Sequence, residues 1–301
     1  MKVLIAGGKG FLGSALRRCL EESGHEVRVL TRHEPASPQE MRWDGRSPGS
    51  WTQSVEETDA VVHVTGHGLD HWPWNRRQKQ RFLDSRVNPG KALAAAIVAA
   101  KRKPAAFVQV SGVHYYGAKG EGVADEGWPA GDDFLAQLTV QWEEATRPVE
   151  QAGVRRAIAR SAVVLSNRGG LFPLMALPVR LWAGGPLGGG KQPVPWIHIQ
   201  DEVEALRFVL ENERASGAFN LVAPEPTSNA EFMRAVAKAL RRPYWFPMPA
   251  LPLRMALGEM STLVLDGRYS APKRLTELGF RFRYPNIGAA LGNLFGRSGV
   301  S

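Results

Sequence analysis

The sequence predicts an α/β fold built on a doubly wound parallel sheet. The first thirteen residues, MKVLIAGGKGFLG, join a short apolar run to three spaced glycines, and an amphipathic stretch follows. Strand-like and helix-like stretches then alternate to about residue 165, which is typical of a parallel sheet covered by helices on both faces. Beyond that point the chain is rich in Gly and Pro. We therefore expect a Rossmann-type domain over residues 1–165 and a smaller C-terminal α/β lobe over 166–301, with about 192–225 returning to the sheet.

The glycine-rich N-terminus predicts a strand, a tight turn and a helix. Residues 3–6 are apolar enough for a buried strand, and residues 11–22 have the spacing of an amphipathic helix. In such a unit the first glycine permits the turn, the second lets a pyrophosphate approach the backbone, and the third lets the helix pack close to the strand. The open N–H groups of the helix start then face the phosphates. The alternative is a glycine-rich turn without a ligand. The predicted phosphate-binding residues are Gly7, Gly10, Phe11, Leu12 and Gly13.

A second strand is expected over residues 26–32, beside the first. Its last residue lies 19 positions after Gly13, where NAD-binding enzymes usually carry an acidic residue on the adenosine ribose. Here Thr31 and Arg32 occupy the strand end. Because a guanidinium binds a 2′-phosphate that a carboxylate would repel, the pair favours NADP(H) over NAD(H). A solvated arginine is the alternative, and Lys9 and Glu34 also lie near the same expected phosphate.

The remaining elements follow from the same patterns. A segment over 75–100 is expected to break near 88–90, because Pro89 disfavours helix at the residue before it. A helix is expected over 132–152. Further strands are expected over 60–65, 106–111 and 156–165.

Composition favours a soluble cytoplasmic enzyme-sized chain. It has 301 residues and a single cysteine, Cys19, which is expected to be a small core residue rather than a nucleophile. No apolar run approaches the roughly 18 residues of a membrane span, and the N-terminus is unlike a signal peptide, so no membrane partner is expected. The net charge of +9 is scattered, without a zinc-ligand or recognition-helix pattern, and therefore predicts no nucleic-acid partner. No spacing of His, Cys or carboxylates indicates a metal site.

Six blocks appear in an order that resembles one protein family. Together with the GxxGxxG spacing of the N-terminus, they are similar to the epimerase-like subgroup of extended or atypical short-chain dehydrogenase/reductases, the NAD(P)-dependent epimerase/dehydratase family. The resemblance spans nearly the whole chain. It implies a Rossmann-type NADP(H)-binding protein with its own small C-terminal substrate domain. The blocks are DSRV (84–87), SGVHYYG (111–117), GDDFLAQLTVQWE (131–143), GGPLGGGKQPVPWIHIQD (184–201), NAEFMRAVAKALRRP (229–243) and GFRFRYP (279–285).

Further cofactor-binding residues are implied by this resemblance. The segment Val64-Thr65-Gly66 matches the family's Leu-Ala-Gly on the adenine-ribose side. Arg86 falls where extended members usually have an asparagine near the cofactor, and Val164 matches a position beside the nicotinamide. The chain departs from its relatives at Thr65, and also at His67 and His114.

The catalytic signature departs furthest from the family. Members use a tyrosine and a lysine four residues later, but the matching positions here are Phe134 and Leu138, so the helix that should carry the pair lacks the usual Tyr-x-x-x-Lys. Ser111 remains and is expected to polarise a carbonyl, with Tyr116 as the candidate proton donor. The alternative for Tyr115 and Tyr116 is packing. Other candidate acids are His67, His71 and His114, whereas His198 is expected to be structural.

These observations leave three function classes open. The first is an NADP(H)-dependent oxidoreductase or epimerase that acts on a small polar or carbonyl substrate. The second is a non-catalytic NADP(H)-binding redox sensor or partner-binding protein, and the third is a cell-division regulator, a label given to some relatives. The stretch 184–190 is expected either to offer backbone amides to the substrate or to be a surface loop. A homodimer is a further hypothesis.

Overall fold

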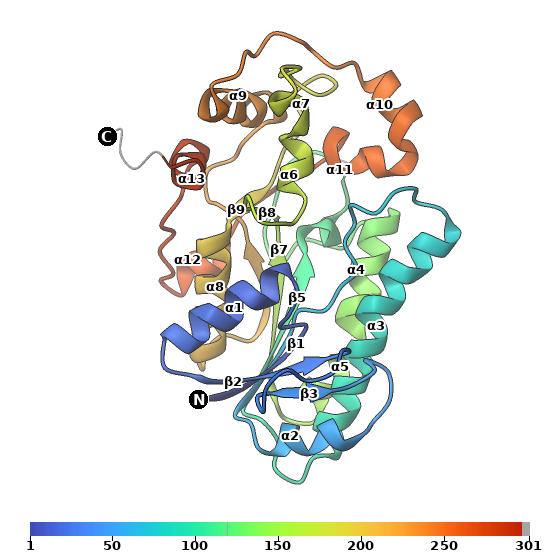
Figure 1. The fold of residues 1–301 in the computed structure, drawn as a ribbon, viewed down its shortest axis with the longest axis vertical. Coiled ribbons are helices and arrows are strands. Elements are labelled where there is room, and N and C mark those ends of the chain that lie inside the picture. The colour runs from blue at the N-terminus through green and yellow to red at the C-terminus, as the bar shows by residue number, and fades with distance from the viewer. Residues whose placement is uncertain (119, 297–301) are drawn as a thin grey trace.

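The computed structural model describes residues 1–118 and 120–296. Its centre is a parallel sheet of seven strands in the order β10-β7-β5-β4-β1-β2-β3 (Figure 1). The sequence order reverses next to β1, as in a doubly wound sheet, so the predicted fold class is confirmed. The strands are β1 (Lys2–Ala6), β2 (Glu26–Thr31), β3 (Glu40–Arg42), β4 (Ala60–His63), β5 (Ala106–Gly112), β7 (Arg155–Ser161) and β10 (Gly217–Leu221).

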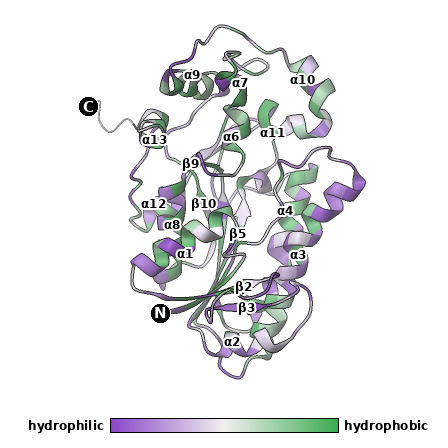
Figure 2. Cartoon of the chain, viewed as in Figure 1, coloured by the Kyte–Doolittle hydropathy of each residue, from purple (hydrophilic) through white to green (hydrophobic). Residues whose placement is uncertain are grey.

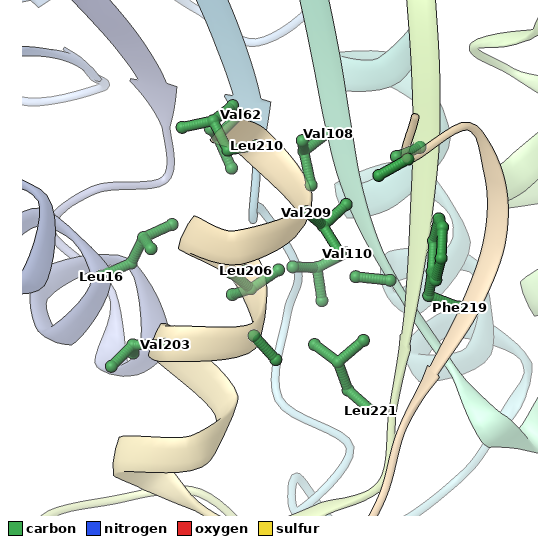
Figure 3. Packing of buried hydrophobic residues seen from close by; sticks show 14 of the residues in the cluster. Leu16, Val62, Val108, Val110, Val203, Leu206, Val209, Leu210, Phe219 and Leu221 are labelled. Atoms are coloured by element: carbon green, nitrogen blue, oxygen red, sulfur yellow. The ribbon is translucent and has the colours of Figure 1, made fainter. Parts of the chain in front are cut away.

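Alternate residues of β1 supply two separate cores, one on each face of the sheet. Val3 and Ile5 join the cluster that includes helices α1 (Phe11–Glu22) and α8 (Ile199–Glu211). Figure 3 shows the α8 side chains Val203, Leu206, Val209 and Leu210 among residues of the central strands. Leu4 and Ala6 face the other way, toward α3 (Arg76–Ala99). This two-residue period is why near-continuous apolar runs such as 3–6 predicted strands buried on both sides.

The helix α3 runs unbroken through Pro89, so the break expected near residues 88–90 was wrong. A proline inside a helix removes the N–H that would bond the carbonyl four residues earlier. That carbonyl belongs to Ser85, and the hydroxyl of Thr65 donates a hydrogen bond to it at 3.2 Å. The side chain of Thr65 therefore replaces the missing backbone donor, and this long-range compensation is invisible to a local sequence rule.

Two further elements differ from the expected ones. The strand expected over 156–165 divides at Ala162, because β7 stays in the main sheet while β8 (Val163–Leu165) pairs with β9 (Trp196–His198). The helix expected over 132–152 divides into α4 (Phe134–Glu144) and α5 (Arg147–Gln151). A proline lies in the first turn of α5, where its missing N–H costs no hydrogen bond.

The C-terminal lobe has its own apolar cluster, which includes Phe172, Trp196, Phe232 and Val236. The division of the chain at residue 165 remains a prediction. Among the described residues, no helix combines the length and the apolar character that a bilayer crossing requires. The other elements are α2 (Gln53–Glu56), α6 (Phe172–Met175), α7 (Leu177–Arg180), α9 (Asn229–Leu240), α10 (Ala250–Leu257), α11 (Thr262–Leu265), α12 (Lys273–Glu277), α13 (Ile287–Leu294), the 3₁₀ turns η1 (Ser50–Thr52), η2 (Val113–Tyr116) and η3 (Gly258–Ser261), and the short pair β6 (Val123–Ala124) and β11 (Tyr269–Ser270).

Candidate functional site

The turn between β1 and α1 requires glycine at two positions for different reasons. Gly7 has φ +94°, a conformation that L side chains rarely adopt, and its carbonyl accepts a hydrogen bond from the N–H of Gly10 at 2.9 Å. A Cβ on Gly13 would lie 2.1 Å from the carbonyl oxygen of Gly7. Any side chain at position 13 would therefore push the helix away from the strand, in agreement with the predicted packing role.

The start of α1 presents backbone N–H groups without a capping side chain. Gly10 is the N-cap residue, and no side chain in the described part of the chain caps the helix there. Its φ of −75° is ordinary, and a Cβ at this position would meet only the carbonyl of Gly7, at 3.3 Å. The fold thus tolerates a side chain at Gly10, whereas the space beyond it belongs to the cleft that Gly10 lines. Open N–H groups and the positive helix end suit an anion in that space.

A cleft of about 590 Å³ opens over this turn at the carboxyl ends of the strands. The glycine turn, the ends of β2 and β4, the loop after β3 and one side of α3 form its wall. A single cleft therefore brings together residues that are distant in sequence. The predicted cofactor residues that line it are Gly7, Gly10, Thr31, Arg32, Val64, Thr65 and Gly66.

The cleft is positively charged beside the end of β2. Arg32 and Arg46 both line it, and neither has a carboxylate partner among the residues that the structure describes. Lys9 also lines the cleft but pairs with Glu40 at 2.7 Å. The backbone N–H of Ala36, followed by Lys9, holds the pKa of the Glu40 carboxyl below its ordinary value, so Glu40 stays charged and offsets the lysine. Arg32 and Arg46 are therefore the cations beside the end of β2 that are available for a phosphate.

Several predicted residues lie outside the lining of this cleft. Phe11, Leu12 and Gly13 form the first turn of α1, and the Phe11 ring lies against Gly169 and Gly170. Val164 is half-buried on β8 and packs against the core.

Arg86 lies beneath the strand-end loop rather than in the cleft. Its side chain is buried, and Nη1 donates to the backbone carbonyls of His67 and Phe82, each at 3.0 Å. Burial lowers the pKa of the guanidinium to about 10, which leaves it charged near neutral pH. A Cβ on Gly66 would come within 3.3 Å of this guanidinium. Arg86 therefore stabilises the backbone of the Gly66–His67 segment.

The loop after β3 contributes wall residues that were not predicted. Trp43 and Arg46 line the cleft, and β3 itself, only three residues long, has no recognisable alternation. The available signal was the Asp44-Gly45 dipeptide, which is typical of a turn. Asp44 accepts backbone hydrogen bonds from Arg46 and Ser47, each at 2.8 Å, and so fixes the loop. Lys9 and His67, which the sequence had placed near the phosphate and among the candidate acids, also line the cleft. The other unpredicted lining residues are Leu30, His33, Gly68, Arg81, Asp84, Ser85 and Pro89.

Ser111 and Tyr116 belong to a buried hydrogen-bond network. Ser111 donates to Glu143 at 2.7 Å, and Arg160 binds both carboxylate oxygens of Glu143 at 2.8 and 2.9 Å. Arg160 also donates to the Tyr116 hydroxyl at 3.0 Å, and that hydroxyl donates to Asn220 at 2.6 Å. Burial raises the pKa of Tyr116 to about 12, so this phenol remains protonated at neutral pH. Neither hydroxyl lines the 590 Å³ cleft.

The positions that carry Tyr and Lys in the resembled family have no titratable side chain here. Phe134 begins α4, and Leu138 is buried one turn later. Both pack in an apolar cluster with Trp74 and Phe82 of the α3 side. The replacement therefore converts the expected proton-transfer position into a packing contact between the helices.

The four candidate histidines differ in their surroundings. His67 stacks on His71 with ring centroids 4.0 Å apart, and its Nε2 accepts from the Gln78 amide at 2.8 Å. Burial lowers the pKa of both His67 and His114, so both favour the neutral form. His198 caps α8 by accepting from the N–H of Gln200 at 3.1 Å, in agreement with its predicted structural role.

The glycines of the stretch 184–190 serve packing within the C-terminal lobe. A Cβ on Gly184 would lie 2.5 Å from the carbonyl oxygen of Pro243, and one on Gly185 would lie 1.9 Å from that of Phe246. The N–H of Gly188 donates to Met248, and that of Gly190 to Leu187. The expectation that this stretch offers its amides to a substrate was therefore wrong for Gly188 and Gly190.

Comparisons with known proteins identify the family that the chain resembles. Residues 3–222 match the NAD dependent epimerase/dehydratase family, and residues 248–294 match a domain of unknown function, DUF1731. The chain is 39% identical over 298 residues to the epimerase family protein MT2273 of Mycobacterium tuberculosis, covering 99% of this chain and 98% of that one.

Two solved structures resemble the whole chain. The human epimerase family protein SDR39U1 (isoform 2), solved with NADPH, is 35% identical with a TM-score of 0.89, and the match covers 99% of this chain and 100% of that one. A nucleoside-diphosphate sugar epimerase from Corynebacterium glutamicum is 33% identical with a TM-score of 0.82, covering 98% of this chain and 58% of that one.

Proposed function

The chain belongs to the NAD dependent epimerase/dehydratase family, and we propose that it binds NADP(H) in the cleft over the glycine turn. The observation that carries the proposal is the meeting of Gly7, Gly10 and Arg32 in one cleft. The NADPH named for the human relative supports the same choice of cofactor.

The residues of the cleft fit each part of NADP(H). The open N–H groups at the start of α1 suit the pyrophosphate, and Gly10 leaves room for it. Arg32, with Arg46 nearby, suits the 2′-phosphate. Val64, Thr65 and Gly66 line the cleft at the end of β4 and suit the adenine-ribose side. When bound, the cofactor supplies hydride transfer, while the protein supplies position and charge.

For the chemistry, we propose an oxidoreductase or epimerase acting on a small polar or carbonyl substrate. Ser111 polarises the carbonyl in this proposal, and Tyr116 donates the proton. Both hydroxyls are held by the network around Glu143 and Arg160, so a substrate must displace the Ser111–Glu143 hydrogen bond before it can bind Ser111. We further propose a cytoplasmic location, and a homodimer as the assembly to be tested.

A second candidate is a non-catalytic NADP(H)-binding redox sensor. The specific observation that favours it is the state of Ser111 and Tyr116, whose hydroxyls already have buried protein partners. The positions of Phe134 and Leu138, which supply no proton, point in the same direction.

Turnover measurements separate the two candidates. NADPH oxidation is followed across a panel of carbonyl compounds, and any active pair is repeated with Ser111→Ala and Tyr116→Phe. An oxidoreductase that uses these groups loses roughly 100-fold or more in kcat, as is usual when acid–base assistance is removed. Tyr244→Phe, which removes a hydroxyl bonded to the Ala230 carbonyl in the C-terminal lobe, is the matched control and keeps full activity. NADPH binding without turnover on the panel supports the sensor, and full activity of both variants rules out the proposed roles.

A further inference from the structure

An exposed apolar surface on the C-terminal lobe has no part in the cofactor cleft. We call it the tryptophan face, and it is formed by residues from the end of α7, the segment before α10 and α10 itself. The exposed fractions of these side chains run from 54% for Phe246 to 79% for Met255. Large side chains of this kind normally lie inside a protein, so a group of them on one lobe requires an explanation. The members are Leu181, Trp182, Trp245, Phe246, Leu251 and Met255.

Direct contacts join the two tryptophans. The indole Nε1 of Trp245 donates to the carbonyl of Trp182 at 2.9 Å, and the N–H groups of Trp245 and Phe246 both donate to Gly184. These bonds anchor the Trp245 ring on the backbone of Trp182, although the two residues are 63 positions apart. The rings are therefore presented by a defined backbone arrangement.

Two non-glycine residues in this part of the lobe have a strained backbone conformation. In the described part of the chain, only Trp182 (φ +67°) and Arg241 (φ +54°) combine a positive φ with a side chain. Both lie just after a helix, at the end of α7 and of α9, where glycine is the usual residue. Tryptophan and arginine are less favourable than glycine at a positive φ, because their side chains strain the backbone. Their presence therefore indicates that the two side chains have a role at the surface.

Helix α10 adds an apolar element with an exposed side: Ala250 and Leu253 pack against the apolar cluster of the lobe, whereas Leu251 and Met255 are exposed. Its sequence is ALPLRMAL, and none of its residues is buried. Leu251 and Met255 are four positions apart and so share one side of the helix. Figure 2 places α10 at the outer edge of the lobe, away from the main sheet.

The chain segments that form the tryptophan face carry charged side chains of one sign only. Residues 174–186 and 238–255 contain five basic side chains and no Asp or Glu. One of the five, Arg254, lies 3.6 Å from Asp266. The other four, which have no carboxylate partner among the described residues, are Arg180, Lys238, Arg241 and Arg242. The guanidinium of Arg242 lies over the Trp182 ring, 4.3 Å from its centroid, so the aromatic and cationic groups form one surface.

We propose that the tryptophan face binds peripherally to an anionic lipid bilayer. Tryptophan, leucine and methionine side chains enter the boundary between headgroups and acyl chains, and arginines beside them bind anionic headgroups. A second copy of the chain docked through the same face would bring unpaired positive charges together, which disfavours that occupant. Such peripheral binding needs no spanning helix, and this proposal departs from the expectation that the chain has no membrane partner.

Vesicle co-sedimentation tests the proposal. The full-length protein is mixed with vesicles of phosphatidylcholine alone or with about one third phosphatidylglycerol. We expect binding to the anionic vesicles that falls at high salt, and little binding to phosphatidylcholine alone. Trp182→Gly suits the positive φ and removes the ring, so it should fold normally and bind roughly 10-fold more weakly. Arg241→Gly should lose roughly 5-fold, the effect of one surface cation.

Matched variants away from the face serve as controls. Val98→Gln on α3 removes an exposed apolar side chain, and Lys101→Ala removes an exposed cation, and both should bind as the unmodified protein does. Thermal unfolding of each variant verifies its fold. The proposal fails if the protein does not bind anionic vesicles, if the controls lose as much binding as Trp182→Gly, or if Trp182→Gly instead alters the oligomeric mass without altering vesicle binding.

Discussion

Arg32 is the residue on which the choice of cofactor depends. It lies directly after β2, lines the cleft and has no carboxylate partner among the described residues. A charge-assisted hydrogen bond contributes about 1.5–3 kcal/mol, so we expect Arg32→Ala to weaken NADP(H) roughly 10- to 150-fold. NAD(H) lacks the 2′-phosphate and should change far less. Titration of both cofactors by fluorescence measures the two ratios.

The nearby Arg42→Ala is the matched control for Arg32→Ala. Arg42 is exposed and pairs with Glu34, and it does not line the 590 Å³ cleft. This variant should keep the preference for NADP(H). Equal losses of NADP(H) and NAD(H) in Arg32→Ala would remove Arg32 from the 2′-phosphate site.

Glu202 predicts a pH dependence of stability. Its carboxyl is buried, accepts a hydrogen bond from Ser161, and has a second oxygen without a partner in the described part of the chain. Burial raises its pKa from 4.5 to about 8. Below about pH 4.5 the Glu202 carboxyl is protonated in both the folded and the unfolded protein. Between about pH 4.5 and 8 it ionises only in the unfolded protein. The free energy of unfolding therefore falls as the pH rises through this range.

Glu202→Gln keeps the shape of the side chain and removes this titration. We expect its melting temperature to exceed that of the unmodified protein by a few degrees near pH 8, with no such gain near pH 4.5, as measured by scanning calorimetry. Glu22→Gln on the exposed side of α1 should leave the pH profile unchanged. A gain from Glu202→Gln that is the same at both pH values would contradict the account.

Sequence reasoning located Arg32 but not the buried network, for a physical reason. The position of Arg32 follows from local periodicity, because a strand end after a glycine-rich turn places it at the sheet edge. Glu143, Arg160 and Asn220 come from a helix and two strands, and only the packed fold brings them to Ser111 and Tyr116. Because these partners are far apart in the sequence, no spacing of residues predicts that they meet.

At the scale of elements, the unbroken helix α3 depends on a contact from the loop after β4. The Thr65 hydroxyl donates its only proton to the Ser85 carbonyl, so in its 2.7 Å contact with Nε2 of His63 it must accept. The sequence predicted a break at Pro89 because local rules consider only the backbone N–H groups of the helix itself as donors. Elements with local signals, such as α1 and β1, were predictable, whereas three-residue β3 was not.

A double-mutant cycle tests this coupling. Thr65→Val should destabilise the protein by about 1–3 kcal/mol, because it leaves the Ser85 carbonyl without its donor. In a Pro89→Ala background the new N–H bonds that carbonyl, so the same change should cost clearly less, although His63 still loses its acceptor. Urea unfolding gives the four free energies. Costs that add within about 0.3 kcal/mol would show that Thr65 does not compensate for Pro89.

Considered as a whole, the molecule joins a predictable domain to a less predictable lobe. Alternating apolar strands and helices specify the parallel sheet, and the right-handed crossover rule restricts how they connect. In the predicted C-terminal lobe many helices are short, and Gly184 and Gly185 are explained by contacts with the backbone of Pro243 and Phe246. The exposed tryptophan face also belongs to this lobe, and exposure cannot be read from composition.

Gly10 offers the most direct test of the central claim that NADP(H) lies over the glycine turn. Its backbone conformation is ordinary and a Cβ meets only one atom of the fold at 3.3 Å, so Gly10→Val should fold while filling the space expected for the pyrophosphate. The deciding measurement is calorimetric titration of NADPH into the unmodified protein and into Gly10→Val. We predict binding of one NADPH per chain, weakened by roughly 100-fold or more in a variant that unfolds at a similar temperature. Unchanged NADPH affinity in Gly10→Val would contradict the account.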